Sequence, residues 1–152
     1  GSATVVVDYA HTPDALERAL VTCRKHCQGQ LWSVFGCGGD RDAGKRPLMG
    51  SIASELSDCI VLTSDNPRSE PPQTILNEIR AGMTKPPMRE EIDRSMAIRF
   101  AVENASPNDY ILIAGKGHES TQVIGHTIRP FSDRVQVARL FGLMDQEVQH
   151  AS

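Results

Sequence analysis

Short apolar runs alternate with segments of helical periodicity along most of this chain, and this alternation limits its fold more than any other feature. The apolar runs predict strands over residues 4–7, 31–35, 59–63 and 110–114, with a further short strand around residues 88–92. Repeated strand–helix units fold as an open, mostly parallel sheet with helices on both faces. The sequence therefore predicts an α/β fold.

Start and stop signals place the helices between these strands. Thr12 is a favourable N-cap before Pro13, and Gly29 is expected to end that helix. Further helices are expected from Pro47, over residues 72–83, after Asp93 and after Asp133. The positions expected to face inward in the second helix are Leu48, Ile52 and Leu56. Near the end of the chain, strand-like segments on either side of Gly125-His126 predict a terminal antiparallel hairpin.

Length and charge narrow the class of protein. The 152 residues suffice for one domain with a full core, and the net charge of −3 disfavours a surface built to hold nucleic acid or anionic lipid. No apolar run approaches the roughly 18 residues of a membrane helix, and no signal peptide opens the sequence. We therefore expect a cytoplasmic domain without nucleic-acid binding or membrane insertion.

The ends of the chain indicate a fragment of a longer protein. Gly1-Ser2 resembles the scar of a cleaved tag, and a strand follows almost directly, without a linker or an initiator Met. We expect one domain over residues 3–145 and a frayed tail over residues 146–152.

Four polar loops follow the predicted strands. Their sequences are DYAHTP (8–13), GCGGDRDAGKR (36–46), SDNPR (64–68) and GKGHE (115–119). Open parallel sheets bind ligands beyond the carboxyl ends of their strands. The four loops are therefore expected to meet at one edge of the sheet and to form the site.

The loop over residues 36–46 has the GxxxxGK spacing of a phosphate-binding loop, from Gly39 to Lys45. However, Arg46 replaces the hydroxyl residue that would ligate Mg²⁺, and two acidic residues stand inside the phosphate cradle. We therefore favour a basic pocket in which Arg41, Lys45 and Arg46 meet a carboxylate or phosphate of a substrate. A solvated basic loop is the alternative.

The Asp-Asn-Pro-Arg segment can hold three polar side chains in set directions. Pro67 fixes its own φ and favours an extended conformation at Asn66. Arg68 can then donate two hydrogen bonds to a carboxylate of a zwitterionic ligand, while Asp65 or Asn66 accepts from the ammonium of that ligand. The alternative is a structural turn whose side chains bond their own backbone. Glu119 is likewise either an ammonium ligand or a solvated carboxylate.

Neither a metal site nor a nucleophile is indicated. The cysteines have no CxxC spacing and no nearby histidine to complete a zinc set, so reduced, mostly buried thiols are expected. Cys37 has basic neighbours but no base with an orienting partner, which argues against nucleophilic catalysis. His11 and His118 are candidate bases or ligand contacts, although a single loop histidine is more often only a hydrogen-bonding group.

These motifs, in this order, resemble the C-terminal domain of the Mur ligases, most closely the type that adds diaminopimelate in peptidoglycan synthesis. The resemblance covers about residues 5–142. DYAHTPD is shared with folylpolyglutamate and cyanophycin synthetases, whereas GGDRDAGKR, DNPR and AGKGHE together are specific. The resemblance implies a Rossmann-like domain, the last of three, whose N-terminal and central partners are absent from this sequence.

The resemblance also implies roles for individual residues. Those at diaminopimelate-binding positions are Arg41, Asp65, Asn66, Pro67, Arg68, Gly115 and Glu119. Those near the ATP ribose and adenine are Asp8, Tyr9 and His11. Lys45 would approach the acyl phosphate, and no residue of this chain would ligate a metal.

The implied chemistry is ATP-dependent amide formation. ATP would phosphorylate a carboxylate of a UDP-N-acetylmuramoyl dipeptide, and an amino group of meso-diaminopimelate would attack the acyl phosphate. The implied cofactors are ATP and Mg²⁺, held mainly by the absent central domain, so the isolated chain is expected to be inactive. The implied enzyme is bacterial, cytoplasmic and monomeric. The alternatives are a sibling ligase, such as one that adds lysine, and an amino-acid-binding module without chemistry.

Overall fold

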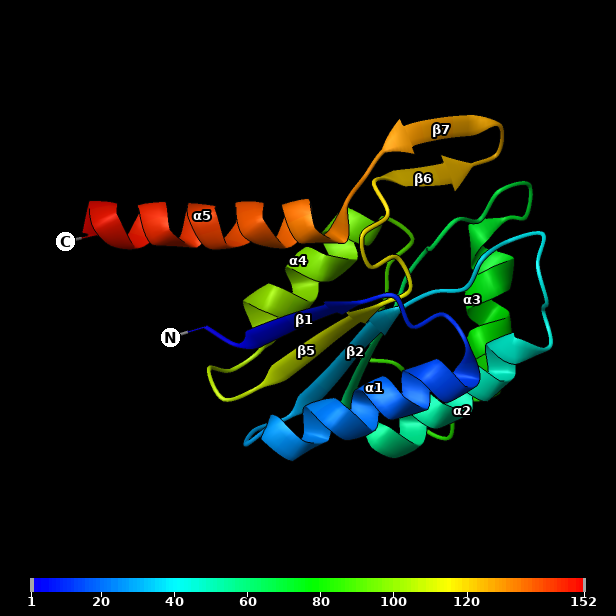
Figure 1. Ribbon diagram of the computed structural model, residues 1–152, viewed down its shortest axis with the longest axis horizontal. Helices are drawn as coiled ribbons and strands as arrows, with labels where there is room; N and C mark the ends of the chain where they lie inside the picture. Colours follow the sequence, from blue (N-terminus) through cyan, green and yellow to red (C-terminus); the bar gives the residue numbers. More distant parts are fainter. Residues whose placement is uncertain (1, 152) are drawn as a thin grey trace.

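A five-stranded parallel sheet forms the centre of the molecule (Figure 1). The computed structural model describes the backbone of residues 2–151 and the side chains of residues 2–142. The strands are β1 (Thr4–Asp8), β2 (Leu31–Phe35), β3 (Cys59–Leu62), β4 (Arg89–Glu90) and β5 (Tyr110–Ala114). Their order is β1-β5-β2-β3-β4, and every pairing is parallel. The α/β class and the parallel sheet are confirmed.

Helices cover both faces of this sheet (Figure 1). The helices are α1 (Pro13–His26), α2 (Lys45–Leu56), α3 (Pro72–Ala81), α4 (Arg94–Asn104) and α5 (Asp133–Ala151). Helices α1, α2 and α3 pack on one face, and α4 and α5 pack on the other. As predicted, Thr12 caps α1 through its side chain, and Asp93 caps α4.

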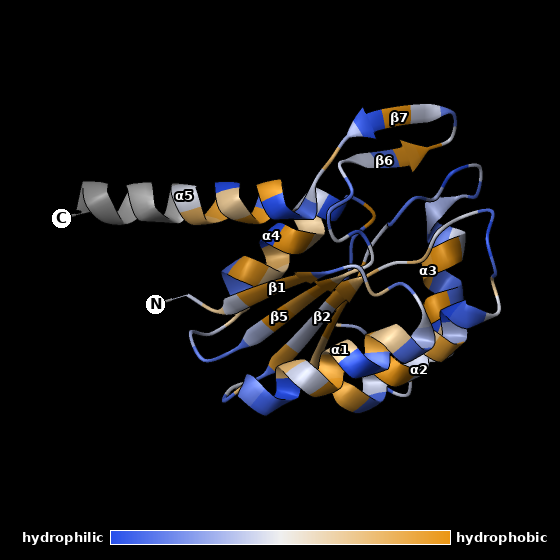
Figure 2. Cartoon of the chain, in the orientation of Figure 1, coloured by the Kyte–Doolittle hydropathy of each residue, from blue (hydrophilic) through white to orange (hydrophobic). Residues whose placement is uncertain are grey.

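Strand β2 shows why the predicted strands read as continuous apolar runs. All five of its residues are buried. Leu31 and Phe35 face the core under α1–α3, while Trp32 and Val34 face the core under α4 and α5. A strand that is covered on both faces has no solvent-facing positions, so apolar and polar residues do not alternate along it. Figure 2 shows the apolar centre of the sheet.

Two details of the helices differ from the predictions, and at each of them a glycine lies in close contact with a neighbouring segment. Leu48, expected inside α2, is 57% exposed, and a buried Gly50 instead brings α2 against α3. A Cβ on Gly50 would lie 2.1 Å from the carbonyl oxygen of Ile79. Helix α1 ends at His26, before Gly29, whose Cβ would lie 2.4 Å from an oxygen of Asp109.

The predicted terminal hairpin is present as a separate antiparallel pair, β6 (Thr121–Ile124) and β7 (Thr127–Pro130). Gly125 in its turn has a φ of 60°, a conformation that favours glycine. The hairpin stands above the carboxyl edge of the sheet (Figure 1). The expected frayed tail reaches beyond the residues whose side chains are described, and it stays a prediction. In the described part of the chain, no helix is long and apolar enough to cross a membrane.

Candidate functional site

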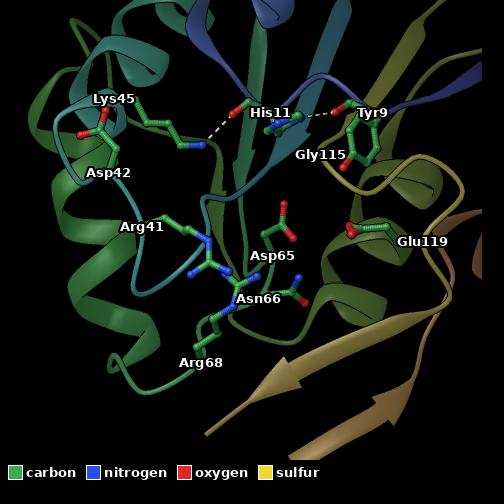
Figure 3. Close-up of a pocket in the computed structure, with 11 residues that line it drawn as sticks. Tyr9, His11, Arg41, Asp42, Lys45, Asp65, Asn66, Arg68, Gly115 and Glu119 are labelled. Atoms are coloured by element: carbon green, nitrogen blue, oxygen red, sulfur yellow. Dashed lines mark hydrogen bonds between the residues drawn. The ribbon is translucent and has the colours of Figure 1, made fainter.

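The loops that follow β1, β2, β3 and β5 line one open pocket of about 370 Å³ (Figure 3). Its lining residues are Tyr9, His11, Gly38, Arg41, Asp42, Lys45, Asp65, Asn66, Arg68, Gly115 and Glu119. The prediction that the four loops meet at one edge of the sheet is therefore confirmed. The volume is that of a site for a small metabolite.

Two arginines and two carboxylates face the pocket, and a third carboxylate, that of Asp42, lies on the side of the arginines. Arg41 and Arg68 both flank Gly38, where a Cβ would lie 3.0 Å from Arg68 Nη1 and 3.6 Å from Arg41 Cγ. The carboxylates of Asp65 and Glu119 project from the other side (Figure 3). This arrangement suits a zwitterion, because guanidinium groups bind a carboxylate and carboxylates bind an ammonium.

Arg68 is held in place by the hairpin. Its φ is 52°, a left-handed conformation that is costly for a residue with a Cβ. Its backbone N–H donates to the Val123 carbonyl at 3.1 Å, and its own carbonyl accepts from Gly125 at 2.6 Å. The guanidinium donates to the Gly39 carbonyl at 3.0 Å, so both ends of the residue are fixed.

Asn66 offers the pocket a donor. Its Oδ1 accepts from Lys116 Nζ at 2.8 Å and from the Val123 backbone N–H at 3.0 Å. The oxygen is therefore already used within the protein, and the amide nitrogen is the polar group left for a ligand. Of the two acceptors expected for the ammonium of a ligand, Asp65 and Asn66, the oxygen of Asn66 does not fit this geometry.

The acidic side depends on a close approach between two loops. Asp65 is only 7% exposed and lies 3.3 Å from Lys116 Nζ. Gly115 has a φ of 121°, and a Cβ there would lie 2.6 Å from Asp65 Oδ2. Glu119, half-buried, follows on the same loop. Only glycine lets the loop after β5 pass this close to Asp65.

Arg46 is not part of the basic side of the pocket, which corrects the sequence prediction. Its side chain is 1% exposed and pairs with Glu70 at 2.9 Å and Glu78 at 2.5 Å. It also donates to the Gly38 carbonyl at 2.9 Å. Hydrogen bonds from Arg46 and from the Asp40 backbone lower the pKa of Glu70 to about 2. Arg46 thus joins the loop after β2 to helix α3, a role without a local sequence signal because its partners are 24 and 32 residues away.

The loop after β2 is not built as a phosphate cradle. Asp40, with a φ of 56°, turns its carboxylate to Ser69, and Asp42 accepts from the Gly44 N–H at 2.9 Å. Lys45 Nζ donates to the His11 carbonyl at 2.8 Å (Figure 3). The side chains of Asp40, Asp42 and Lys45 are thus bonded to neighbouring protein groups, which fits a loop other than a nucleotide-binding P-loop.

Some candidate residues do not line the pocket. Asp8 accepts from the backbone N–H of Ala10 at 3.0 Å and so shapes its own loop. Pro67 packs on the neighbouring loop, where a Cβ on Gly39 would lie 1.8 Å from its carbonyl oxygen. His118 is exposed and contacts Arg134 at 2.7 Å. The described residues hold no group of three or more His, Cys, Asp or Glu placed to bind a metal.

Three buried polar residues that support the pocket were not predicted from the sequence. Lys116 is fully buried beneath Asn66, and Gln122 donates to the Asp65 carbonyl at 2.8 Å. Arg94 reaches the carbonyls of Ser64 and Ala114 from the other face of the sheet. Lys116 lies within the GKGHE motif, which was a usable signal, whereas Arg94 at the start of a helix reads as an ordinary solvated residue.

Comparisons with known proteins agree with this fold. A family model described as "Mur ligase, glutamate ligase domain" matches residues 1–117. A structure of UDP-N-acetylmuramoyl-L-alanyl-D-glutamate–2,6-diaminopimelate ligase is 47% identical, with a TM-score of 0.88, over 93% of this chain and 29% of that one.

More distant structures share the fold. MurF ligase from Thermotoga maritima, in complex with ADP, is 12% identical with a TM-score of 0.56, over 100% of this chain and 30% of that one. The bifunctional folylpolyglutamate synthase/dihydrofolate synthase from Yersinia pestis, complexed with AMPPNP and Mn, is 21% identical with a TM-score of 0.57. The match covers 73% of this chain and 25% of that one. This chain spans less than a third of each of these ligases. From the family match and the 47% identity, the chain belongs to the Mur ligase family and contains its glutamate ligase domain.

Proposed function

We propose that this chain is the amino-acid-binding domain of an ATP-dependent ligase that adds meso-diaminopimelate to UDP-N-acetylmuramoyl-L-alanyl-D-glutamate. One observation carries the proposal: the pocket sets Arg41 and Arg68 against Asp65 and Glu119. The 47% identity to a ligase of that name supports it. This division of charge fits an amino acid that carries both a carboxylate and an ammonium at its far end.

The carboxylate and the ammonium at the far end of the ligand each have partners in this proposal. One carboxylate is bound by Arg68 and shared by Arg41 and the amide nitrogen of Asn66, because all three groups are donors. The adjacent ammonium is bound by Glu119 and the Gly115 carbonyl, with Asp65 beside them. Pro67 contributes by fixing the backbone between Asn66 and Arg68.

ATP is proposed to lie against the loop after β1. Tyr9 and His11 line the pocket, their rings 4.7 Å apart, and Asp8 shapes their loop. Lys45, beside His11, would face the acyl phosphate. Magnesium does not fit the described residues, which offer no cluster of ligands and no hydroxyl residue at the end of the loop after β2. We therefore assign Mg²⁺ and the phosphates to the remainder of the ligase.

The domain's contribution to the reaction is orientation. The ligase would use ATP to phosphorylate the D-glutamyl carboxylate, and the amine would displace inorganic phosphate from the acyl phosphate. Holding the amine at the correct distance and angle converts a bimolecular encounter into an intramolecular step. A monomeric ligase in the bacterial cytoplasm remains part of this proposal.

The test compares the complete ligase with this chain alone. With ATP, Mg²⁺, the UDP-N-acetylmuramoyl dipeptide and meso-diaminopimelate, the complete ligase should form the tripeptide product, identified by mass spectrometry. This chain alone should release no phosphate above a protein-free blank. If the complete protein forms no amide product, the chain is an amino-acid-binding module and not part of a ligase. If this chain alone turns over substrate, the assignment of ATP phosphates and Mg²⁺ to the remainder of the ligase is wrong.

A further inference from the structure

Lys116 is a buried cation beneath the pocket. It is 0% exposed, and its ammonium donates to Asn66 Oδ1 at 2.8 Å and to the Thr121 carbonyl at 3.1 Å, while Asp65 Oδ1 lies 3.3 Å away. An ammonium has three donor hydrogens and no acceptor. Asn66 and Thr121 accept two of these hydrogens, and Asp65 pairs with the charge of the ammonium.

The Asn66 side chain could in principle take either of two orientations, which exchange its oxygen and its nitrogen. Both of its protein neighbours are donors, namely Lys116 Nζ and the backbone N–H of Val123. Reversing the amide would set an NH₂ group against an ammonium and an N–H, so the Val123 N–H would lose its side-chain acceptor and Lys116 would lose one of its partners. Only the orientation with the oxygen inward satisfies them, and it leaves the amide nitrogen for the pocket.

We propose that Lys116 is a positioning residue that fixes the Asn66 amide with its nitrogen toward the ligand, and so makes the pocket select a carboxylate there. The inference rests on the proposed function, because it concerns how that same pocket distinguishes meso-diaminopimelate from lysine. Without Lys116, only the Val123 N–H still holds the amide oxygen inward. The reversed orientation, which presents an oxygen that accepts from an ammonium and repels a carboxylate, then becomes more populated.

The test is the ratio of kcat/KM for meso-diaminopimelate to kcat/KM for lysine, measured in the complete ligase. Lys116→Met should lower this ratio at least about tenfold, the effect of one 1.4 kcal/mol interaction, mainly through KM for meso-diaminopimelate. Lysine is the internal reference for the ammonium groups that both amino acids carry, and the Asn66→Ala background below gives the part of the change that comes from the lost charge alone. Lys85→Met is the matched control, since Lys85 Nζ also donates to a main-chain carbonyl, that of Ser57 at 2.7 Å, and does not line the pocket.

A double-mutant cycle separates positioning from a general structural role. In an Asn66→Ala background, Lys116→Met should change the ratio by no more than about twofold, because the group through which it acts is gone. Equal losses in both backgrounds, or an unchanged ratio in the single variant, would overturn the inference. A wild-type ligase with no preference for meso-diaminopimelate would instead overturn the proposed function.

A measurement on the unmodified ligase covers the case in which Lys116→Met fails to fold. With ¹⁵N-asparagine label, the side-chain amide resonance of Asn66, assigned by its loss in Asn66→Ala, should shift on titration with meso-diaminopimelate. It should shift much less with lysine. Equal shifts with both amino acids, or no shift with meso-diaminopimelate, would contradict the assigned orientation.

Discussion

Arg94 and Asp133 form a bidentate ion pair that is completely buried, and both nitrogen–oxygen distances are 2.7 Å. The same guanidinium donates to the carbonyls of Ser64 and Ala114, at 3.0 and 3.1 Å. These carbonyls lie where the loops after β3 and β5 leave the sheet. The pair therefore ties the start of α4 and the start of α5 to the two loops that carry Asp65 and Glu119.

Arg94→Met should lower the free energy of unfolding of this chain by about 3–5 kcal/mol, because it leaves Asp133 buried without its cation. Urea denaturation monitored by circular dichroism measures the loss. Arg24→Met is the control: its pair with Asp58 is 44% and 40% exposed and should contribute no more than about 1 kcal/mol. Equal losses of unfolding free energy for the two variants would show that the buried pair stabilises the fold no more than the exposed pair does.

Glu70 should make the chain acid-sensitive over a defined range. Hydrogen bonds from Arg46 and the Asp40 backbone lower its pKa from 4.5 to about 2. Its contribution to stability is therefore complete above pH 4.5 and is lost as the pH falls toward 2. Glu70→Gln should cost about 1–3 kcal/mol at pH 7 and flatten the decline over that range. Unfolding curves at several pH values measure both, and parallel profiles for the two proteins would contradict this account.

Cys37 should be inert in the folded chain. It is 2% exposed, and its burial raises the pKa of its thiol to about 12. Iodoacetamide at pH 8 should therefore label the half-buried Cys27 well before Cys37, because the thiolate is the reactive form. Peptide mass spectrometry gives the order, with urea-unfolded protein as the reference in which all four cysteines react. Early labelling of Cys37 would indicate that its loop opens.

Arg41→Ala in the complete ligase should raise KM for the amino acid more than KM for ATP. Its guanidinium is assigned to a ligand carboxylate, and losing a charge-assisted hydrogen bond costs about 1.5–3 kcal/mol. Steady-state kinetics with each substrate varied in turn measure the two constants. Arg18→Ala, on α1 and outside the pocket lining, is the control. An equal rise in both KM values would place Arg41 elsewhere.

The sequence was sufficient to predict the sheet and the edge at which the loops meet. Strand β2 and strand β5 are buried on both faces, so their apolar runs were unambiguous, and a parallel sheet brings the ends of its strands together. The hairpin was predictable because Gly125 supplies the positive φ that its turn needs.

Long-range pairing of charged residues could not be predicted in the same way. Arg46, at the start of α2, is as basic as Arg41 in the loop just before it, yet Arg46 is buried against Glu70 and Glu78 whereas Arg41 lines the pocket. No local pattern distinguishes them, because the acidic partners come from a distant segment. The orientation of the Asn66 amide likewise depends on Lys116, which is 50 residues away.

The central claim is that this pocket binds an amino acid with a second carboxylate, and the most direct measurement compares meso-diaminopimelate with lysine. Lysine would leave Arg68 without its anion, a penalty on the order of 1–3 kcal/mol. The kcat/KM of the complete ligase should therefore favour meso-diaminopimelate by at least about tenfold to a hundredfold. Equal values, or a preference for lysine, would show that Arg68 does not bind a carboxylate of the substrate.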